Sequence, residues 1–246
     1  MFIYNKMPHS ISAESYKSIR TSLKYSSVDK TIKTIVITSS VPGEGKSTIA
    51  GNLALCLSES GNKVLIIDCD LRRPSLHKKF RLSNLKGITD CLIDKDNLKE
   101  SIQEFTSELS VISAGTIPPN PAEILGSKTF ERFLKNIGSI YDYIILDTPP
   151  LLAVTDASIL AGKADATIIV VKYGKTREKD INLAYKELKK VNANVVGSIL
   201  NSCDMKRTDS YYKYYTEEKK GFFNKNQEKE IMKNIKQKKL MLKISN

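Results

Sequence analysis

A glycine-rich segment at residues 39–48, "SSVPGEGKST", contains the residue types that bind phosphate groups. Its two glycines allow backbone N–H groups to turn toward a phosphate without a Cβ in the way. Lys46 would contact the β- and γ-phosphates as a point charge, and Ser47 would offer its hydroxyl to Mg²⁺. The segment departs from the P-loop pattern G-x-x-x-x-G-K-[ST] at one position, where Ser40 replaces the first glycine. We therefore predict that ATP binds to Gly43, Glu44, Gly45, Lys46, Ser47 and Thr48.

Acidic residues end two apolar segments, "VLIIDCDLRRP" (64–74) and "YDYIILDTPP" (141–150). Because side chains alternate between the faces of a strand, Asp68 and Asp70 are predicted to point to one face. Two carboxylates at the carboxyl end of a strand would bind Mg²⁺ or accept a proton from a hydroxyl group. Helix-capping or solvated aspartates are the alternative. Asp147 has the place of a Walker B carboxylate, which holds Mg²⁺. The predicted metal site consists of Ser47, Asp68, Asp70 and Asp147.

The segments that must position these residues alternate between strands and helices. The predicted strands are continuous apolar runs, which is typical of a parallel sheet covered on both faces. We therefore expect an α/β fold of the doubly wound, P-loop NTPase-like class, with a mostly parallel sheet and shorter elements within 76–140. The predicted helices are 10–27, 47–61, 156–164 and 176–191, and the predicted strands are 34–40, 63–68, 109–115, 141–147, 166–174 and 195–201.

The composition fits one large folded domain. The chain has 246 residues, of which 41% are hydrophobic and 27% charged. No run approaches the 18 apolar residues of a membrane span, and the first residues lack the apolar stretch of a signal peptide. Four cysteines are scattered without the spacing of a metal site or a disulfide framework, which is typical of a reducing compartment. We therefore expect a cytoplasmic protein.

The basic excess lies mainly in the last residues of the chain. The formal net charge is +12, and residues 206–246 carry twelve Lys/Arg against five Asp/Glu. This placement argues against a nucleic-acid-binding face. The tail would contact anionic lipid or an acidic partner, or it would be a solvated extension. We predict an N-terminal helix region at 1–30, a P-loop domain at 31–205 and a flexible tail at 206–246.

The tail begins with an unusual cluster of four tyrosines within "DSYYKYYTEE" (209–218). The cluster follows neither the period of a strand nor that of a helix, so it is not expected to form core. Together with the earlier motifs, it gives the chain a resemblance to the bacterial tyrosine kinases of capsule and exopolysaccharide synthesis. The resemblance covers roughly residues 10–215 and includes "VPGEGKST", "LIIDCDLRRP", "PPNPAEIL", "YDYIILDTPPLLAVTDA" and "GSILN".

The resemblance implies an ATP- and Mg²⁺-dependent protein-tyrosine autokinase that regulates polysaccharide synthesis and export. Lys46 would hold the ATP phosphates, and Asp68 would act as base or orienter for the tyrosine hydroxyl. Asp70 and Asp147 would complete the metal environment. Arg72 would organise the site or its subunit interface, and Asn201 would contact the adenine. The implied phosphate acceptors, on a neighbouring subunit, are Tyr211, Tyr212, Tyr214 and Tyr215.

The resemblance also implies partners. The family's oligomerisation signature, E-x-x-R-x-x-R-x-N, corresponds here to Glu14, Lys17, Arg20 and Ser22, and it would support a ring-like homo-oligomer. Lysine for the first arginine removes a planar two-pronged donor. A transmembrane chain-length regulator would activate the kinase through a cytoplasmic segment and keep it at the inner face of the membrane. A cognate tyrosine phosphatase would reverse the reaction.

Two other functions remain open from the sequence. The first is an ATPase switch of the MinD/ParA type, which usually has a lysine early in the P-loop, at the position of Val41. The second is an ATP-binding scaffold whose tyrosines are phosphorylated by another enzyme. The missing lysine and the tyrosine cluster argue against the ATPase switch. ATP-dependent labelling of the purified protein would separate the scaffold from a kinase.

Overall fold

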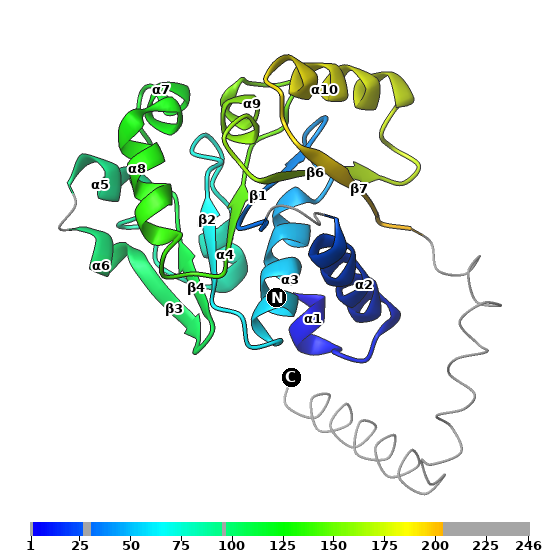
Figure 1. Ribbon diagram of the computed structural model, residues 1–246, viewed down its shortest axis with the longest axis horizontal. Coiled ribbons are helices and arrows are strands. Elements are labelled where there is room, and N and C mark those ends of the chain that lie inside the picture. The colour runs from blue at the N-terminus through cyan, green and yellow to red at the C-terminus, as the bar shows by residue number, and fades with distance from the viewer. Residues whose placement is uncertain (1, 27–30, 95–96, 204–246) are drawn as a thin grey trace, which may run out of the picture. The chain divides into compact units, whose positions relative to one another are not determined.

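A single sheet with helices on both sides forms the centre of the described structure (Figure 1). The structure is a computed structural model, and it describes residues 2–26, 31–94 and 97–203. The tyrosine cluster and the basic tail lie outside these residues. The described strands are β1 (Thr34–Ser39), β2 (Val64–Asp68), β3 (Ile102–Thr106), β4 (Leu109–Ile112), β5 (Tyr143–Asp147), β6 (Ala166–Lys172) and β7 (Val195–Asn201).

The strand order is β3-β4-β2-β5-β1-β6-β7. All neighbouring pairs are parallel except β3 and β4, so the predicted mostly parallel sheet is confirmed. The central strands β2, β4 and β5 are buried almost along their whole length, which explains their continuous apolar sequences. Strand β3 was not predicted, because "IQEFT" is a half-exposed edge strand without an apolar run.

One face of the sheet is covered by α1 (Ile3–Lys6), α2 (Ile11–Tyr25), α3 (Lys46–Ser58) and α4 (Leu76–Phe80). Ser10 caps the N-terminus of helix α2, because its hydroxyl accepts a hydrogen bond of 3.2 Å from the N–H of Ala13. Helix α3 is buried on nearly every side, because it packs on the sheet, α1 and α2 together. It follows that the helix carrying the P-loop lysine is rigidly embedded.

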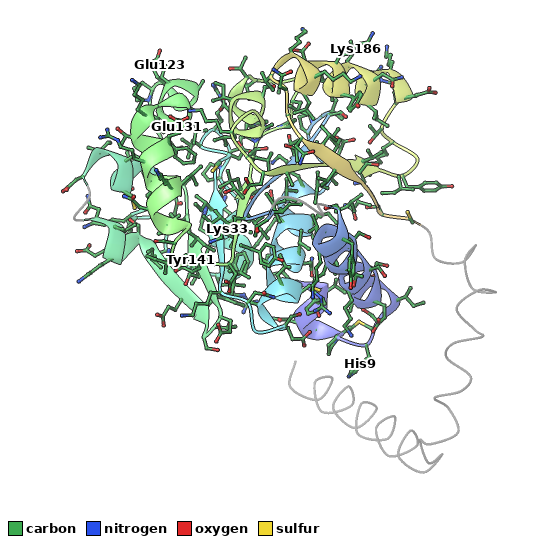
Figure 2. All side chains as sticks on the ribbon, viewed as in Figure 1. His9, Lys33, Glu123, Glu131, Tyr141 and Lys186 are labelled. Atoms are coloured by element: carbon green, nitrogen blue, oxygen red, sulfur yellow. The ribbon has the colours of Figure 1, made fainter. Side chains whose placement is uncertain are left out.

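The opposite face is covered by α5 (Ile88–Ile93), α6 (Leu98–Ser101), α7 (Pro121–Gly126), α8 (Lys128–Ile137), α9 (Asp156–Ala161) and α10 (Glu178–Lys190). Phe130, Leu160 and Leu188 are buried from this side against the sheet. Charged side chains cover the solvent side of these helices, with Glu131 and Lys186 as examples (Figure 2). In the part of the chain that the structure describes, no helix is long and apolar enough to cross a membrane.

The strand order brings three loops together. Strand β5 lies between β1 and β2, and the three strands run in the same direction. The residues that follow β1, β2 and β5 therefore meet at one edge of the sheet, where parallel sheets bind their ligands. The register places Asp68 opposite Asp147 and Ile37 beside Asp147. The predicted phosphate-binding and acidic residues consequently share one site.

Candidate active site

The P-loop joins β1 to α3 through two glycines in the left-handed region. Gly43 has φ of 81° and Gly45, which precedes the first residue of α3, has φ of 93°. Residues other than glycine are strained in this conformation. The loop therefore turns its backbone toward the N-terminus of a 13-residue helix, where the partial positive charge favours phosphate.

The C-terminal part of the sheet holds this loop in place. The Asn201 side-chain amide donates to the carbonyl of Glu44 at 2.8 Å, across 157 residues of sequence. The Glu44 carboxylate accepts a hydrogen bond from the N–H of Val41 at 3.0 Å and another from the hydroxyl of Thr176. Thr176 in turn accepts from the N–H of Lys172 at 2.9 Å. Glu44 and Asn201 thus fix the loop from behind, and Thr176 is a contributor that the sequence analysis missed.

A cavity of about 630 Å³ lies in front of the loop. Seven predicted site residues line it, whereas Glu44, Asp68, Asp147 and Asn201 do not. The residues that line it are Pro42, Gly43, Gly45, Lys46, Ser47, Thr48, Asp70, Arg72, Arg73, Ser75, Lys79, Pro149, Pro150, Ala153 and Val154.

An ion pair crosses the cavity from the P-loop to the residues after β2. Lys46 Nζ lies 2.9 Å from Asp70 Oδ2, and the two side chains are 14% and 8% exposed. Burial lowers the pKa of Lys46, but the charges of Asp147 and Asp70 outweigh it, so the pKa lies above its ordinary value. Lys46 is therefore a permanent cation, and a carboxylate faces the same cavity.

Asp68 and Asp70 do not act as a matched pair. Asp68 ends β2 and accepts backbone N–H groups from Asp70, Ser75 and Leu76 at 3.2, 2.8 and 2.9 Å. Asp70 lies past the strand in a turn, where its other oxygen accepts from the N–H of Arg73 at 3.1 Å. Cys69, which lies between them, packs in the core of the opposite face with Leu65 and Ile67, and this agrees with the predicted alternation of Cys69 and the two carboxylates.

The carboxylate of Asp147, by contrast, is buried without regular hydrogen bonds from the described residues. Burial raises the pKa of Asp147, although the charge of Lys46 and the Ser47 hydroxyl oppose the shift. Burial also raises the pKa of Asp68, and the charge of Asp147 adds to that shift. An unpaired buried carboxylate is costly, which points to a cationic ligand at this position.

The oxygens at this site fit Mg²⁺. The Asp147 carboxylate has free acceptor capacity, and the Ser47 hydroxyl lines the cavity. No cluster of three or more His, Cys, Asp or Glu side chains within the described ranges forms a metal site by itself. Mg²⁺ usually keeps several waters and takes one or two carboxylates together with substrate phosphates. Mg²⁺ would therefore bind here together with a nucleotide.

Basic side chains complete the site. Arg72 makes a two-pronged ion pair with Asp156, a buried residue in the first turn of α9, at 3.0 and 3.1 Å. Lys79 donates to the Thr48 hydroxyl at 2.9 Å. The sequence analysis missed Asp156, Arg73 and Lys79, although the run "LRRPSLHKKF" directly after the acidic residues was an available signal.

Glu14, Lys17, Arg20 and Ser22, which match the oligomerisation signature, lie on α2 and do not line the cavity. Lys17 pairs with Glu14 at 2.8 Å, and both side chains are partly exposed. Arg20 donates to the carbonyl of Cys56 at 3.2 Å and contacts the hydroxyl of Ser60, both on or near α3. An oligomer that uses Arg20 would have to share it with these contacts.

Gly45→Ala is expected to weaken Mg-ATP binding by about tenfold or more. A Cβ here would collide with the Asn201 side-chain amide and would force a strained φ, at about 1–3 kcal/mol for the strain alone. Titration of a fluorescent ATP analogue measures the loss. Gly61→Ala is the matched control, because Gly61 has φ of 81° but open space around it. Wild-type affinity in Gly45→Ala would show that the loop tolerates a different conformation.

Comparisons with known proteins agree with this geometry. A family model described as "AAA domain" matches residues 32–200. The chain is 40% identical to "Tyrosine-protein kinase YwqD" of Bacillus subtilis, over 86% of this chain and 90% of that protein. It is 34% identical to "Putative tyrosine-protein kinase CapB" of Staphylococcus aureus, over 89% and 96%. Among solved structures, the kinase domain of Escherichia coli tyrosine kinase ETK matches with a TM-score of 0.78 and 34% identity, over 82% of this chain and 79% of that one. These relatives are similar over most of both chains, and the P-loop and the aspartates at the ends of β2 and β5 agree with them. The chain therefore belongs to the bacterial tyrosine-protein kinases.

Proposed function

We propose that this kinase transfers the γ-phosphate of ATP to the tyrosine cluster of a neighbouring copy of itself. The acceptors are Tyr211, Tyr212, Tyr214 and Tyr215. The observation that carries the proposal is the Lys46–Asp70 ion pair in the P-loop cavity. It puts a phosphate-binding cation and a carboxylate into the one space where phosphate donor and hydroxyl acceptor would meet, and phosphoryl transfer depends mainly on such positioning.

The phosphates of ATP would bind to the amides of the P-loop, to Lys46 and to the Thr48 hydroxyl. Asn201 acts through the loop that it holds, and a further contact with the adenine is part of the proposal. During transfer, the bond between the γ-phosphorus and the β–γ bridging oxygen breaks, and ADP leaves with its electron pair. A bond from the tyrosine oxygen to the same phosphorus forms.

The hydroxyl proton needs an acceptor, because tyrosine has a pKa of about 10 in water. Asp70 faces the cavity, so it is placed to take the proton as the new bond forms. Asp68 is the orienter, because its oxygens bind the amides of the turn that carries Asp70. Arg72 organises the same turn through its ion pair with Asp156.

The residues Ser47 and Asp147 would hold Mg²⁺, with Asp68 and Asp70 in the surrounding shell. When bound, Mg²⁺ would neutralise charge on the β- and γ-phosphates. Mg²⁺ would also provide a cationic partner for Asp147, whose buried carboxylate has no regular hydrogen bond to the residues that the structure describes.

The partners follow from the family resemblance. We propose regulation of capsule or exopolysaccharide synthesis and export, activation by the cytoplasmic segment of a transmembrane chain-length regulator, and reversal by a tyrosine phosphatase. The kinase would then work at the inner face of the cell membrane. Glu14, Lys17 and Arg20 would contribute to a ring of copies, in which the tyrosine cluster of one copy reaches the site of the next.

The direct test is phosphate mapping by mass spectrometry on the purified full chain after incubation with Mg-ATP. The incubation is run with and without a regulator's cytoplasmic segment. We expect phosphate on the four clustered tyrosines and none in a variant with all four changed to Phe. ATP hydrolysis with unmodified tyrosines in both incubations would indicate an ATPase switch instead. Phosphotyrosine that forms only when another kinase is added would indicate a scaffold.

A further inference from the structure

The cavity has two walls of different chemistry. One wall, here called the basic wall, consists of Arg72, Arg73 and Lys79, which follow β2. The other, here called the apolar wall, consists of Pro149, Pro150, Ala153 and Val154, which follow β5. In the strand order, the loop after β5 lies between the P-loop, which follows β1, and the loop after β2, and residues of all three line the cavity. A ligand that enters beside the phosphates would therefore meet both walls.

The basic wall has positive charge that the fold itself does not use. Arg72 is paired with Asp156, and Lys46 with Asp70. The ammonium group of Lys79 donates to a neutral hydroxyl, that of Thr48. The exposed guanidinium of Arg73 has no hydrogen-bond or ion-pair partner anywhere in residues 2–26, 31–94 and 97–203. Its backbone, by contrast, is fixed by two hydrogen bonds to Asp70.

The apolar wall is held firmly against the end of β1. The Thr38 hydroxyl donates to the carbonyl of Pro149 at 3.0 Å, and the N–H of Leu151 donates to the carbonyl of Ser39 at 2.8 Å. Two consecutive prolines restrict the backbone further. A preorganised apolar surface of this kind suits the flat ring of an aromatic side chain.

The sequence around the tyrosine cluster has the complementary charge. Residues 209–218 contain Asp209, Glu217 and Glu218 against one basic residue, Lys213, although the whole tail is basic. Each phosphotyrosine adds about −1.5 to −2 charges at pH 7. The segment is thus acidic before the first transfer, and each transfer makes it more so.

We propose that Arg73, supported by Lys79, selects acceptor tyrosines that have an anionic group nearby, while the tyrosine ring packs on the apolar wall. A planar guanidinium binds a carboxylate or a phosphate with two parallel hydrogen bonds. The anionic group is either a neighbouring carboxylate or a phosphotyrosine made in an earlier transfer. In the second case the first phosphate promotes the next ones. The inference rests on the proposed transfer to tyrosine, and it adds a specificity determinant to it.

The test uses two full-length chains. The donor has its four clustered tyrosines changed to Phe, and it carries Arg73, Arg73→Gln or the control Lys78→Gln. The acceptor carries Lys46→Met and has either the natural tail or a neutral one with Asp209→Asn, Glu217→Gln and Glu218→Gln. Lys78 suits the control because it is an exposed cation on α4 that does not line the cavity.

With the Arg73 donor, we expect kcat/KM to fall about tenfold from the natural to the neutral acceptor, the size of one lost charged hydrogen bond. The Arg73→Gln donor should show no such preference and a raised KM for the natural acceptor, with the KM for ATP changed less than about twofold. Lys78→Gln should behave like the parent donor. Two neutral acceptors, one with a single tyrosine in the cluster and one with all four, distinguish a carboxylate from a phosphotyrosine as the anionic group. If the second transfer to the neutral acceptor with four tyrosines is faster than the first, a phosphotyrosine is the anionic group.

Three outcomes have distinct meanings. Equal kcat/KM for both acceptors with the Arg73 donor, together with second transfers no faster than the first, would overturn the selection by charge and leave the kinase proposal intact. A raised KM for ATP in Arg73→Gln, with the acceptor preference unchanged, would also overturn it and assign Arg73 to the nucleotide. Phosphate on none of the acceptor tyrosines, with ATP still hydrolysed, would contradict the proposed function itself.

Discussion

Lys46→Met is expected to reduce tyrosine phosphorylation by at least about 10²-fold, the usual cost of removing one preorganised donor from a developing anionic charge. Lys46 is largely buried in the cavity, where its charge acts with little screening by water. Methionine keeps most of the side-chain volume and removes only the charge. Quantitative phosphotyrosine detection on the full chain, at saturating Mg-ATP, measures the effect.

The same substitution has a structural cost that must be separated from the chemical one. Without Lys46, the carboxylate of Asp70 loses its ion-pair partner, at up to about 3 kcal/mol. The double variant Lys46→Met/Asp70→Asn should regain thermal stability and remain inactive. Lys78→Met, outside the cavity, should retain activity. Substantial phosphorylation by a stable double variant would remove Lys46 from the proposed mechanism.

Asp147→Asn is expected to have opposite effects on stability and on catalysis. In the nucleotide-free protein, the change replaces a buried carboxylate that has no regular hydrogen bond within the described residues, so the free energy of unfolding should rise by about 1–2 kcal/mol. The variant also loses a proposed Mg²⁺ ligand, so phosphorylation should fall by about 10²-fold or more. Urea unfolding without nucleotide and phosphotyrosine formation with Mg-ATP measure the two effects.

The stability gain should depend on pH in a defined direction. The folded-state pKa of Asp147 is raised by burial, so the carboxyl group supports folding where it is protonated. That support is complete below the unfolded pKa of about 4 and is lost as the pH rises through the folded-state pKa. The difference between Asp147→Asn and the parent should therefore be largest near pH 7.5 and smaller near pH 5. A difference that grows toward low pH would mean that the carboxylate is stabilised in the fold.

A third measurement links the two effects of this substitution. If Mg²⁺ and nucleotide satisfy Asp147 in the complex, Mg-ATP should raise the melting temperature of the parent protein more than that of Asp147→Asn. Equal shifts would indicate that Asp147 has no contact with the bound metal. Asp165→Asn is a suitable comparison, because Asp165 is a surface carboxylate that accepts backbone N–H groups from Lys33 and Thr34, outside the cavity.

Local patterns in the amino-acid sequence are enough to predict several elements of this fold. Continuous apolar runs identified β1, β2 and β5, because strands buried on both faces need apolar side chains at every position. The glycines of the P-loop identified a backbone that must turn through positive φ. The edge strand β3 and the short helix α1 gave no such signal, because each gains its stability from neighbours instead of its own pattern.

The positions of the predicted side chains relative to the cavity depend, in contrast, on the tertiary fold. Asp68 and Asp70 are two residues apart, yet one binds loop amides and the other pairs with Lys46. Asn201 reaches Glu44 only because β7 and the P-loop end at the same edge of the sheet. Such contacts depend on strand order and on the closing of long loops. Local periodicity gives no information about strand order or about which distant segments meet. Residue type and spacing therefore predict the elements of this kinase but not the partners of their side chains.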